Sequence, residues 1–310
     1  MVLKWKVILA FAIIYLVWGT TYLAILFVIK DIPPFLMSGI RFLLAGLVLY
    51  LICLVRKEQQ PDITSLMRNT LQGILLLVGG TGSVALAEQY LPSSTAAIIV
   101  TAVPFYFILL DHRQWKSNFS NKVLLSGLLI GFVGVVLLMN LNKGSFSSNV
   151  NSGRRISAIL VLVVGGVMWA SGSLISKYRP SGKSLLMNTA VQLLVAGIFC
   201  LCAGVFSGES KHFSFSQVHR NAWLGLAYLV TFGSILTYMC YLWLLKTKPA
   251  TQVSSYVYVN PIVAVIVGGI IGNETISMLH IFSLAIILCG VLLINLPKYN
   301  IQKVKRLLLG

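Results

Sequence analysis

The chain has 310 residues, of which 57% are hydrophobic and only 10% are charged, and its mean hydropathy is +0.89. A soluble domain carries about 25% charged residues, so this composition excludes an ordinary soluble globule and indicates an integral membrane protein. Lys and Arg number 24 against 7 Asp and Glu, a net charge of +17. Because the basic residues lie in short stretches between apolar runs, they indicate loops at a membrane surface, and we expect no nucleic-acid partner.

Ten apolar segments follow one another along the chain, each close to the length of about 20 residues that a helix needs to cross a bilayer. They span roughly residues 7–29, 33–55, 70–90, 92–110, 123–141, 156–176, 184–206, 221–245, 249–271 and 277–297. Backbone groups in lipid must be satisfied within the segment, and no alternating pattern indicates a barrel. The sequence therefore predicts an all-α polytopic membrane protein with ten transmembrane helices.

The first apolar run, residues 7–29, is too long for the core of a signal peptide, so we expect it to be retained as the first span. All five cysteines lie inside apolar runs and lack metal-ligand spacing, and the loop histidines show none either. No phosphate-binding Walker motif occurs. We therefore expect no metal site, no cofactor and no direct use of ATP by this chain.

Basic residues are distributed unequally between the two sides of the predicted bundle. If the N-terminus is cytoplasmic, 17 of them lie on that side and 6 on the other, with Arg41 inside a span. Lysine and arginine are enriched in cytoplasmic loops. The counts therefore predict a multi-pass protein of the cell membrane with both termini in the cytoplasm.

Similar residues recur in the two halves of the chain. Trp18 and Trp169 are 151 residues apart, and the pairs Pro92/Pro249 and Pro104/Pro261 are each separated by 157. Five spans per copy is an odd number, so two copies would cross the membrane in opposite senses, which is typical of alternating-access transporters. We predict a first repeat over residues 1–142, a polar linker over 143–155, and a second repeat with a basic tail over 156–310.

The order of short motifs also resembles a known family. The motifs are Trp18-Gly19-Thr20, Arg41 to Gly46, Ala87 to Ser94, Pro104, Pro249-Ala250, Asn260-Pro261, Gly272 to Glu274, and Gly290 to Leu293. Together they resemble the EamA-type branch of the drug/metabolite transporter superfamily. The resemblance implies an inner-membrane carrier with a central cavity that exports amino acids or other small metabolites.

The chain departs from the family pattern at the turn after the fourth helix of each repeat. The family often has Gly-Glu-Arg there, whereas Thr275 replaces the arginine in the second half and Asp111 to Trp115 replace the motif in the first. The wide variety of substrates in the family prevents naming a substrate from the resemblance.

Two ionisable residues, Arg41 and Glu88, fall within the predicted spans. Charged groups in a bilayer are costly and are therefore candidates for function. One interpretation is structural: they pair with each other, or Arg41 reaches outward to Asp31. The other is that Glu88 alternates between protonated and exposed states and couples proton entry to efflux.

Pro104 and Pro261 are predicted to act as hinges. A proline inside a helix frees the carbonyl four residues earlier, and bent helices at matching places in two repeats mark transport sites. The alternative is a passive kink, because proline is common in membrane helices.

Polar and aromatic residues gather around these prolines and in the first, sixth and eighth spans, where Thr237 and Tyr241 also lie. As a group they are predicted to line a wet cavity, although single Ser and Thr residues also serve helix packing. The predicted cavity residues are Trp18, Thr20, Thr21, Tyr22, Thr101, Trp169, Ser171, Ser173, Tyr238, Tyr256, Tyr258 and Asn260.

These features favour a secondary transporter that exports a small organic metabolite. Two alternatives stay open: an exchanger of larger sugar-conjugate or lipid-linked substrates, and a non-transporting intramembrane enzyme or scaffold that would need a pair such as Ser171 and His280. The expected partners are a small-molecule substrate and the lipid bilayer. A homodimer is also open, with Gly127 and Gly131 as small residues suited to helix packing within or between protomers.

Overall fold

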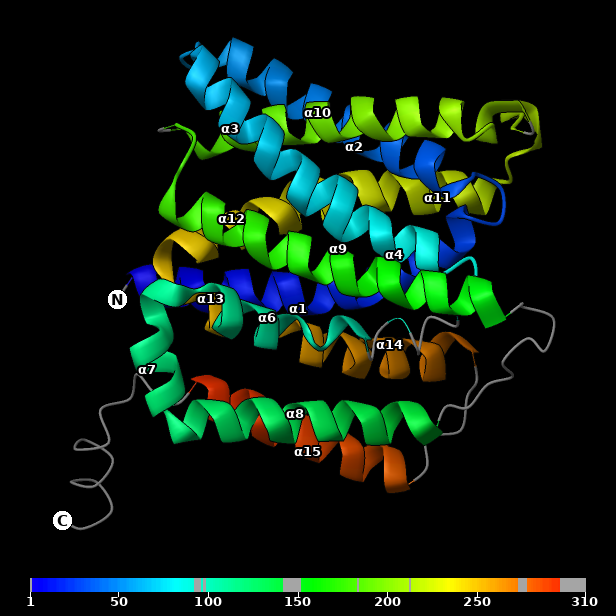
Figure 1. Ribbon diagram of the computed structural model, residues 1–310. Coiled ribbons are helices and arrows are strands. Elements are labelled where there is room, and N and C mark those ends of the chain that lie inside the picture. Colours follow the sequence, from blue (N-terminus) through cyan, green and yellow to red (C-terminus); the bar gives the residue numbers. More distant parts are fainter. Residues whose placement is uncertain are drawn as a thin grey trace.

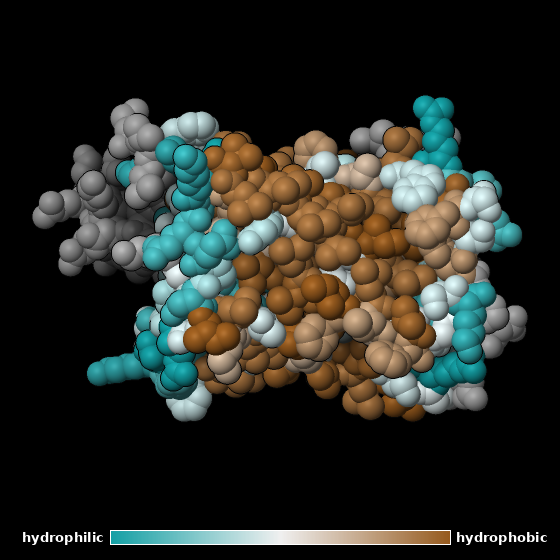
Figure 2. Space-filling view, turned by 90° about the horizontal axis from the view of Figure 1, so that it is seen from above, coloured by the Kyte–Doolittle hydropathy of each residue, from teal (hydrophilic) through white to brown (hydrophobic). Residues whose placement is uncertain are grey.

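The computed structural model describes residues 2–91, 96, 99–141, 152–182, 184–211, 213–272 and 278–295. Within these ranges the regular structure is entirely helical, which confirms the predicted all-α class. The long helices lie side by side in one bundle (Figure 1), and an apolar belt covers the middle of the face seen in Figure 2, between two hydrophilic ends. Such a belt is suited to a bilayer.

Both halves of the chain contain long helices interrupted by short or non-α segments. In chain order, the first half contains α1 (Val2–Val28), α2 (Pro34–Val55), α3 (Ile63–Gly73), the π-helix η1 (Ile74–Thr81), α4 (Gly82–Ala87), α6 (Val103–Leu110), the 3₁₀ turn η2 (His112–Gln114), α7 (Trp115–Ser120) and α8 (Lys122–Leu141). The second half contains α9 (Ser152–Tyr178), α10 (Leu185–Phe206), the 3₁₀ turns η3 (Glu209–Lys211) and η4 (Phe215–Gln217), α11 (Arg220–Tyr228), the π-helix η5 (Leu229–Leu236), α12 (Thr237–Thr247), α13 (Ala250–Val253), α14 (Tyr256–Gly272) and α15 (Met278–Asn295).

Fewer than ten of these helices qualify as membrane spans by length and composition. Among the described residues six segments do, and the bent pair His112–Ser120 and Lys122–Leu138, which meet at 88°, would make a seventh. The six are Lys4–Ile25, Pro34–Val55, Ile63–Ala87, Gly153–Tyr178, Leu185–Phe206 and Arg220–Thr247. Three predicted spans are not among these segments. A turn at 254–255 divides the span predicted at 249–271, and the span predicted at 92–110 includes residues outside the described ranges. The span predicted at 277–297 contains one continuous apolar helix, Ile281–Asn295, which is shorter than a full span. The structure therefore supports a multi-pass helical protein without establishing ten spans.

The third helical segment begins earlier than predicted, at Ile63 rather than near residue 70. Its N-cap is Asp62, whose side chain accepts a hydrogen bond of 3.1 Å from the backbone N–H of Ser65. The first turns of α3 are polar, so the apolar run begins only after the helix has already started. Hydropathy detects the part of this helix in the bilayer, whereas the capping residue sets its true beginning.

Equivalent helices of the two halves pack against each other at opposite edges of the bundle. α2 lies along α10 at one edge and α8 lies along α15 at the other (Figure 1). Gly46 and Gly197, 151 residues apart, form the first crossing, where a Cβ on Gly197 would lie 2.6 Å from the backbone nitrogen of Leu43. At the second crossing, Gly127 and Gly131 contact α15, so these two glycines serve packing within one chain.

The inner helices interlock reciprocally. α1 packs against α11, η5, α12 and α14 of the second half, while α9 packs against η1, α4 and α6 of the first half. Each half therefore inserts its first helix into the other half. The helix surfaces that meet in the middle of the bundle come from both halves of the chain, so any cavity there is lined by both halves.

Candidate functional site

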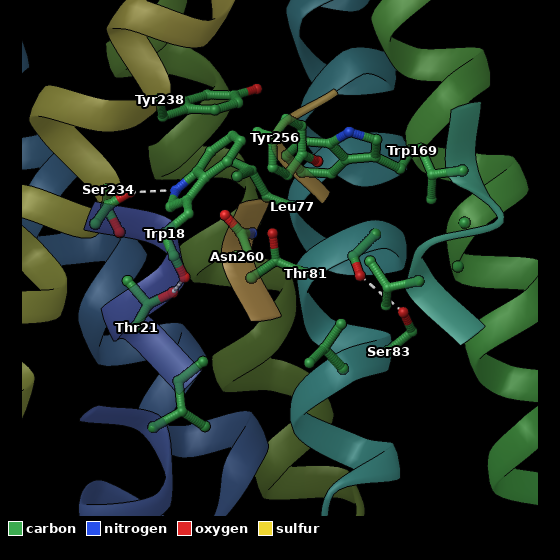
Figure 3. A pocket seen from close by; sticks show the side chains of 18 of the residues that line it. Trp18, Thr21, Leu77, Thr81, Ser83, Trp169, Ser234, Tyr238, Tyr256 and Asn260 are labelled. Carbon is green, nitrogen blue, oxygen red and sulfur yellow. Dashed lines mark hydrogen bonds between the residues drawn. The ribbon is translucent and has the colours of Figure 1, made fainter. Parts of the chain in front are cut away.

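A cavity with about 100 Å³ of space for water-sized molecules lies between the two halves of the bundle. Its wall comes from α1, α2, η1, α4, α6, α9, η5, α12 and α14, with Val100 as well (Figure 3). Concave sites lined mainly by apolar and aromatic side chains with a few polar groups are typical of small-molecule binding. The lining residues are Trp18, Thr21, Ile25, Arg41, Phe42, Leu77, Gly80, Thr81, Ser83, Val84, Val100, Val103, Leu162, Gly165, Gly166, Trp169, Gly233, Ser234, Tyr238, Tyr256 and Asn260.

Two π-helices form opposite parts of this wall. η1 and η5 are each eight residues long and begin 155 residues apart, so they occupy matching places in the two halves. π-Helical segments are rare and concentrate at functional sites. η1 contributes Gly80 and Thr81 to the cavity, and η5 contributes Gly233 and Ser234.

Sequence reasoning missed these four residues and Ser83. The available signal was a cluster of small residues, Gly-Gly-Thr-Gly-Ser at 79–83 and Gly-Ser at 233–234, inside otherwise apolar spans. Small residues let backbones approach closely. At Gly165 of α9, for example, a Cβ would lie 1.9 Å from the Ser83 hydroxyl oxygen.

Four rings form an aromatic cluster beside the cavity: Trp18, Trp169, Tyr241 and Tyr256. The ring centroids of Trp18 lie 5.6 Å from Trp169, 5.2 Å from Tyr241 and 4.7 Å from Tyr256. Such edge-to-face and tilted contacts stabilise aromatic pairs. The repeated tryptophans found in the sequence therefore meet where the halves join, and Trp18 Nε1 also donates to the Gly233 carbonyl at 3.2 Å.

A buried polar network lies behind Tyr238. The Tyr238 hydroxyl donates to Gln192 Oε1 at 2.6 Å, and Gln192 Nε2 donates to Asn69 Oδ1 at 3.1 Å and to Gln72 Oε1 at 2.8 Å. Asn69 Nδ2 in turn donates to Asn188 Oδ1 at 3.2 Å. The network ties α3, α10 and α12 together from the cavity wall toward the loop that contains Gly182, whose carbonyl accepts from Asn188.

The structure brings half of the predicted cavity residues into the wall. Those that line it are Trp18, Thr21, Trp169, Tyr238, Tyr256 and Asn260. Figure 3 shows Trp18, Asn260 and Thr81 directed toward one another in the cavity.

The other predicted cavity residues are placed elsewhere. Thr20 shares a hydrogen bond of 2.5 Å with the Tyr228 hydroxyl, Ser173 donates to the carbonyl of Trp169, and Tyr258 donates to the carbonyl of Leu128. Thr101 and Ser171 are not among the described residues of the cavity wall. The side chain of Tyr22 lies outside the described part of the structure. Helix periodicity explains the difference, because neighbouring residues point to different sides.

Among the described residues, Arg41 forms neither of the ion pairs considered for it. Its Nε donates to the Ser234 hydroxyl at 2.6 Å, whereas Asp31 pairs with His219 at 3.0 Å. Glu88 is buried at the end of α4, and neither of its oxygens has a hydrogen-bond partner within the described ranges. The pairing interpretation is therefore wrong, because α2 directs Arg41 toward η5.

The two predicted hinge prolines differ in position. Pro104 lies in the first turn of α6, directly after a turn at 101–102, whereas Pro261 lies inside α14. A first-turn proline needs no backbone donor and costs the helix little, so only Pro261 interrupts the bonding of a continuous helix.

Comparison with known proteins gives consistent results. The model of the EamA-like transporter family matches residues 5–140 and again residues 156–296. The uncharacterized inner membrane transporter YedA of Escherichia coli is 35% identical over 92% of this chain and 89% of its own length. The uncharacterized transporter YvbV of Bacillus subtilis is 27% identical over 97% and 94%. A solved structure with 18% identity superposes with a TM-score of 0.74, covering 93% of this chain and 96% of that one.

Proposed function

Because this chain belongs to the EamA-like transporter family, we propose that it is a secondary transporter that exports a small organic metabolite across the inner membrane by alternating access. The observation that carries the proposal is the cavity between the halves, whose wall contains matching pieces of both: Trp18 and Trp169, and one π-helix from each. A site at the junction of two repeats is exposed to either side by a rocking motion of one repeat against the other.

The aromatic cluster and the polar network supply the closed side of this cycle. The aromatic cluster joins α1, α9, α12 and α14. The polar network joins α3, α10 and α12. Breaking them would open a path from the cavity past Tyr238 and Gln192. Pro261, inside α14, supplies the bend that such a movement needs, since a proline removes one backbone bond.

We further propose that Glu88 couples transport to protons. It lies one helical turn beyond Val84, which lines the cavity, and its backbone N–H donates to the Val84 carbonyl at 3.0 Å. Its neighbours in the chain, Ala87 and Leu91, belong to a buried apolar cluster that also contains Leu162. A carboxyl group held there without a described partner is suited to exchange a proton when an opening admits water.

Counterflow in proteoliposomes tests the proposal, with a panel of labelled metabolites and with or without a proton gradient. Trp18→Ala should abolish saturable flux, while Trp223→Ala, an exposed tryptophan outside the cavity wall, should leave it intact. Glu88→Gln should retain counterflow but lose the response to the gradient. Equal loss in both tryptophan variants, or no flux of any small solute, would contradict the cavity as the transport site and favour the larger-substrate or enzyme alternatives.

The orientation and the repeat boundaries belong to the same proposal. The described chain begins and ends at one end of the bundle, where α1 starts and α15 stops (Figure 1). We place this end in the cytoplasm on the charge distribution. We take the linker between oppositely oriented repeats from residues 143–155, of which 152–155 already form the first turn of α9.

A further inference from the structure

The cavity contains a buried positive charge without a negative partner among the described residues. Arg41 is 4% exposed and is the one charged residue among those that line the cavity in the described part of the chain. No carboxylate of the described residues forms an ion pair with it. Its hydrogen-bond partner is a neutral hydroxyl, that of Ser234.

The guanidinium is held in a fixed place by η5. Nε is oriented by Ser234, and Nη2 lies against Gly233, where a Cβ would approach it to 2.9 Å. Gly233 therefore leaves room for the charge, and the bond to Ser234 uses only Nε, so it leaves the two terminal nitrogens of this cavity-lining residue for a ligand. The planar edge of a guanidinium binds a carboxylate through two parallel hydrogen bonds.

The charge balance selects among anions. A buried lone charge is costly, and an incoming anion offsets that cost. One arginine balances one negative charge, whereas a phosphate monoester carries roughly −1.5 to −2 and would need further cations that the described wall does not offer. A monocarboxylate therefore fits the site better than a phosphate ester.

The rest of the wall determines the remainder of the solute. Trp18, Phe42, Trp169, Tyr238 and Tyr256 surround the cavity with rings, which suits an apolar or aromatic body. One polar exception is Asn260, which is 3% exposed and whose Oδ1 has no hydrogen-bond partner among the described residues. This oxygen can accept one N–H or O–H of the solute.

We propose that the transport cavity selects small organic monocarboxylates of net charge −1 with an apolar or aromatic body, and that Arg41, positioned by Ser234, binds the carboxylate. The inference rests on the proposed function, because it names the class of solute that the same cavity takes.

Three probes of one shape separate the alternatives: 3-phenylpropanoate (an anion), 3-phenylpropanamide (neutral) and phenylalanine (a zwitterion). Binding to the purified full chain in detergent is measured by titration calorimetry. The acid should bind at least about tenfold more tightly than the amide, because a charge-assisted hydrogen bond exceeds a neutral one, and also more tightly than phenylalanine. Equal binding of acid and amide, preference for phenylalanine, or failure of the acid to bind at millimolar concentration would overturn the proposal.

Variants test the named residues. Arg41→Gln should weaken binding of the acid at least about tenfold and leave the amide unchanged, whereas Arg220→Gln, at an exposed arginine outside the cavity, should change neither. Ser234→Ala keeps the charge and should weaken the acid by a smaller factor, which provides a test if Arg41→Gln fails to fold. An unchanged preference for the acid in both Arg41→Gln and Ser234→Ala would refute the role of Arg41.

Flux distinguishes this inference from the transport proposal. Acid-selective binding without counterflow would refute transport and leave the anion site standing. Saturable counterflow of the amide with no dependence on Arg41 would refute the anion site and leave transport standing.

Discussion

Gly197 lies where α10 crosses α2, and any Cβ there would lie 2.6 Å from the backbone nitrogen of Leu43. Backbone cannot move aside as a flexible side chain can, so the two helices would have to separate. We expect Gly197→Ala to lower the free energy of unfolding by roughly 1–3 kcal/mol, the usual cost of overpacking. Thermal unfolding in detergent measures the loss.

Gly82→Ala is the matched control for this prediction. Gly82 also lies in a helix, but its added Cβ would lie 3.6 Å from the nearest atom, an ordinary contact. Alanine is a better helix former than glycine, so this variant should be neutral or slightly more stable. Equal destabilisation of both variants would show that the crossing distance is not the cause.

Asp31 and His219 join the segment after α1 to the start of α11. The backbone N–H of His219 donates to Asp31 Oδ2 at 2.8 Å, and this bond, followed by the bond and charge of the His219 ring, lowers the pKa of Asp31. A pKa lowered on folding adds stability above the unfolded value, near 4, and that stability is lost as pH falls through the folded pKa.

We therefore expect Asp31→Asn to unfold at a lower temperature than the unmodified chain at pH 7, with the difference shrinking as the pH falls below the unfolded value, near 4, and through the folded pKa of Asp31. His219→Gln should have a smaller effect, because the larger cause is a backbone donor that the substitution keeps. Melting curves across this pH range provide the measurement. A difference that persists at low pH would show that charge at Asp31 is not responsible.

Among the helices, the polar network joins three elements through one residue. Gln192 of α10 contacts Asn69, Gln72 and Tyr238, and it is 1% exposed. Gln192→Leu would remove the partner of three buried oxygens: Asn69 Oδ1, Gln72 Oε1 and the Tyr238 hydroxyl. Each such group costs about 1–3 kcal/mol, so the variant should be strongly destabilised.

Thr189→Val is the control in the same helix. Thr189 is fully buried too, but its hydroxyl donates to the carbonyl of Leu185 in its own helix rather than to another element. We expect a change below about 1 kcal/mol for this variant. Similar melting temperatures for the two variants would contradict a role of the network in joining the helices.

The positions of helices were predictable from the sequence, whereas their local departures from α-helical geometry were not. The apolar runs predicted where α2 and α10 lie to within a residue at each end. The π-helices η1 and η5 were not predicted, because Leu77 or Val230 satisfies the same hydropathy pattern in an α-helix. η1 packs against α9 and η5 against α2, and such contacts between distant helices are not contained in a hydropathy pattern.

For the molecule as a whole, the charge distribution makes a topological prediction. Gln59 follows α2 and Ser216 precedes α11, and both are exposed. In a chain whose native cysteines are replaced, Ser216→Cys should react with a membrane-impermeant maleimide added to intact cells, and Gln59→Cys should react only after permeabilisation. The reverse pattern would invert the orientation, and reaction of both in intact cells would refute the span order between them.

Composition and local pattern were enough to establish the class of environment, the helical fold, the repetition of Trp18 at Trp169, and the family. These properties are local, since transfer into lipid and backbone hydrogen bonding within a helix involve residues near in the chain. The same reasoning also identified six of its twelve cavity candidates, those whose side chains face the junction of the halves.

The partners of those residues became known only from the packed bundle. Arg41 bonds to Ser234, 193 positions away on η5, rather than to Glu88 or Asp31. Thr81 and Gly233 line the cavity although neither was among the predicted cavity residues. Contacts at such separation depend on how the helices cross and on how far each helix is rotated about its own axis. Successive side chains on a helix differ in direction by about 100°, so this rotation decides which of them face the cavity. Local pattern carries no information on that rotation, so the composition of the site depends on the packing of helices that are distant in the chain.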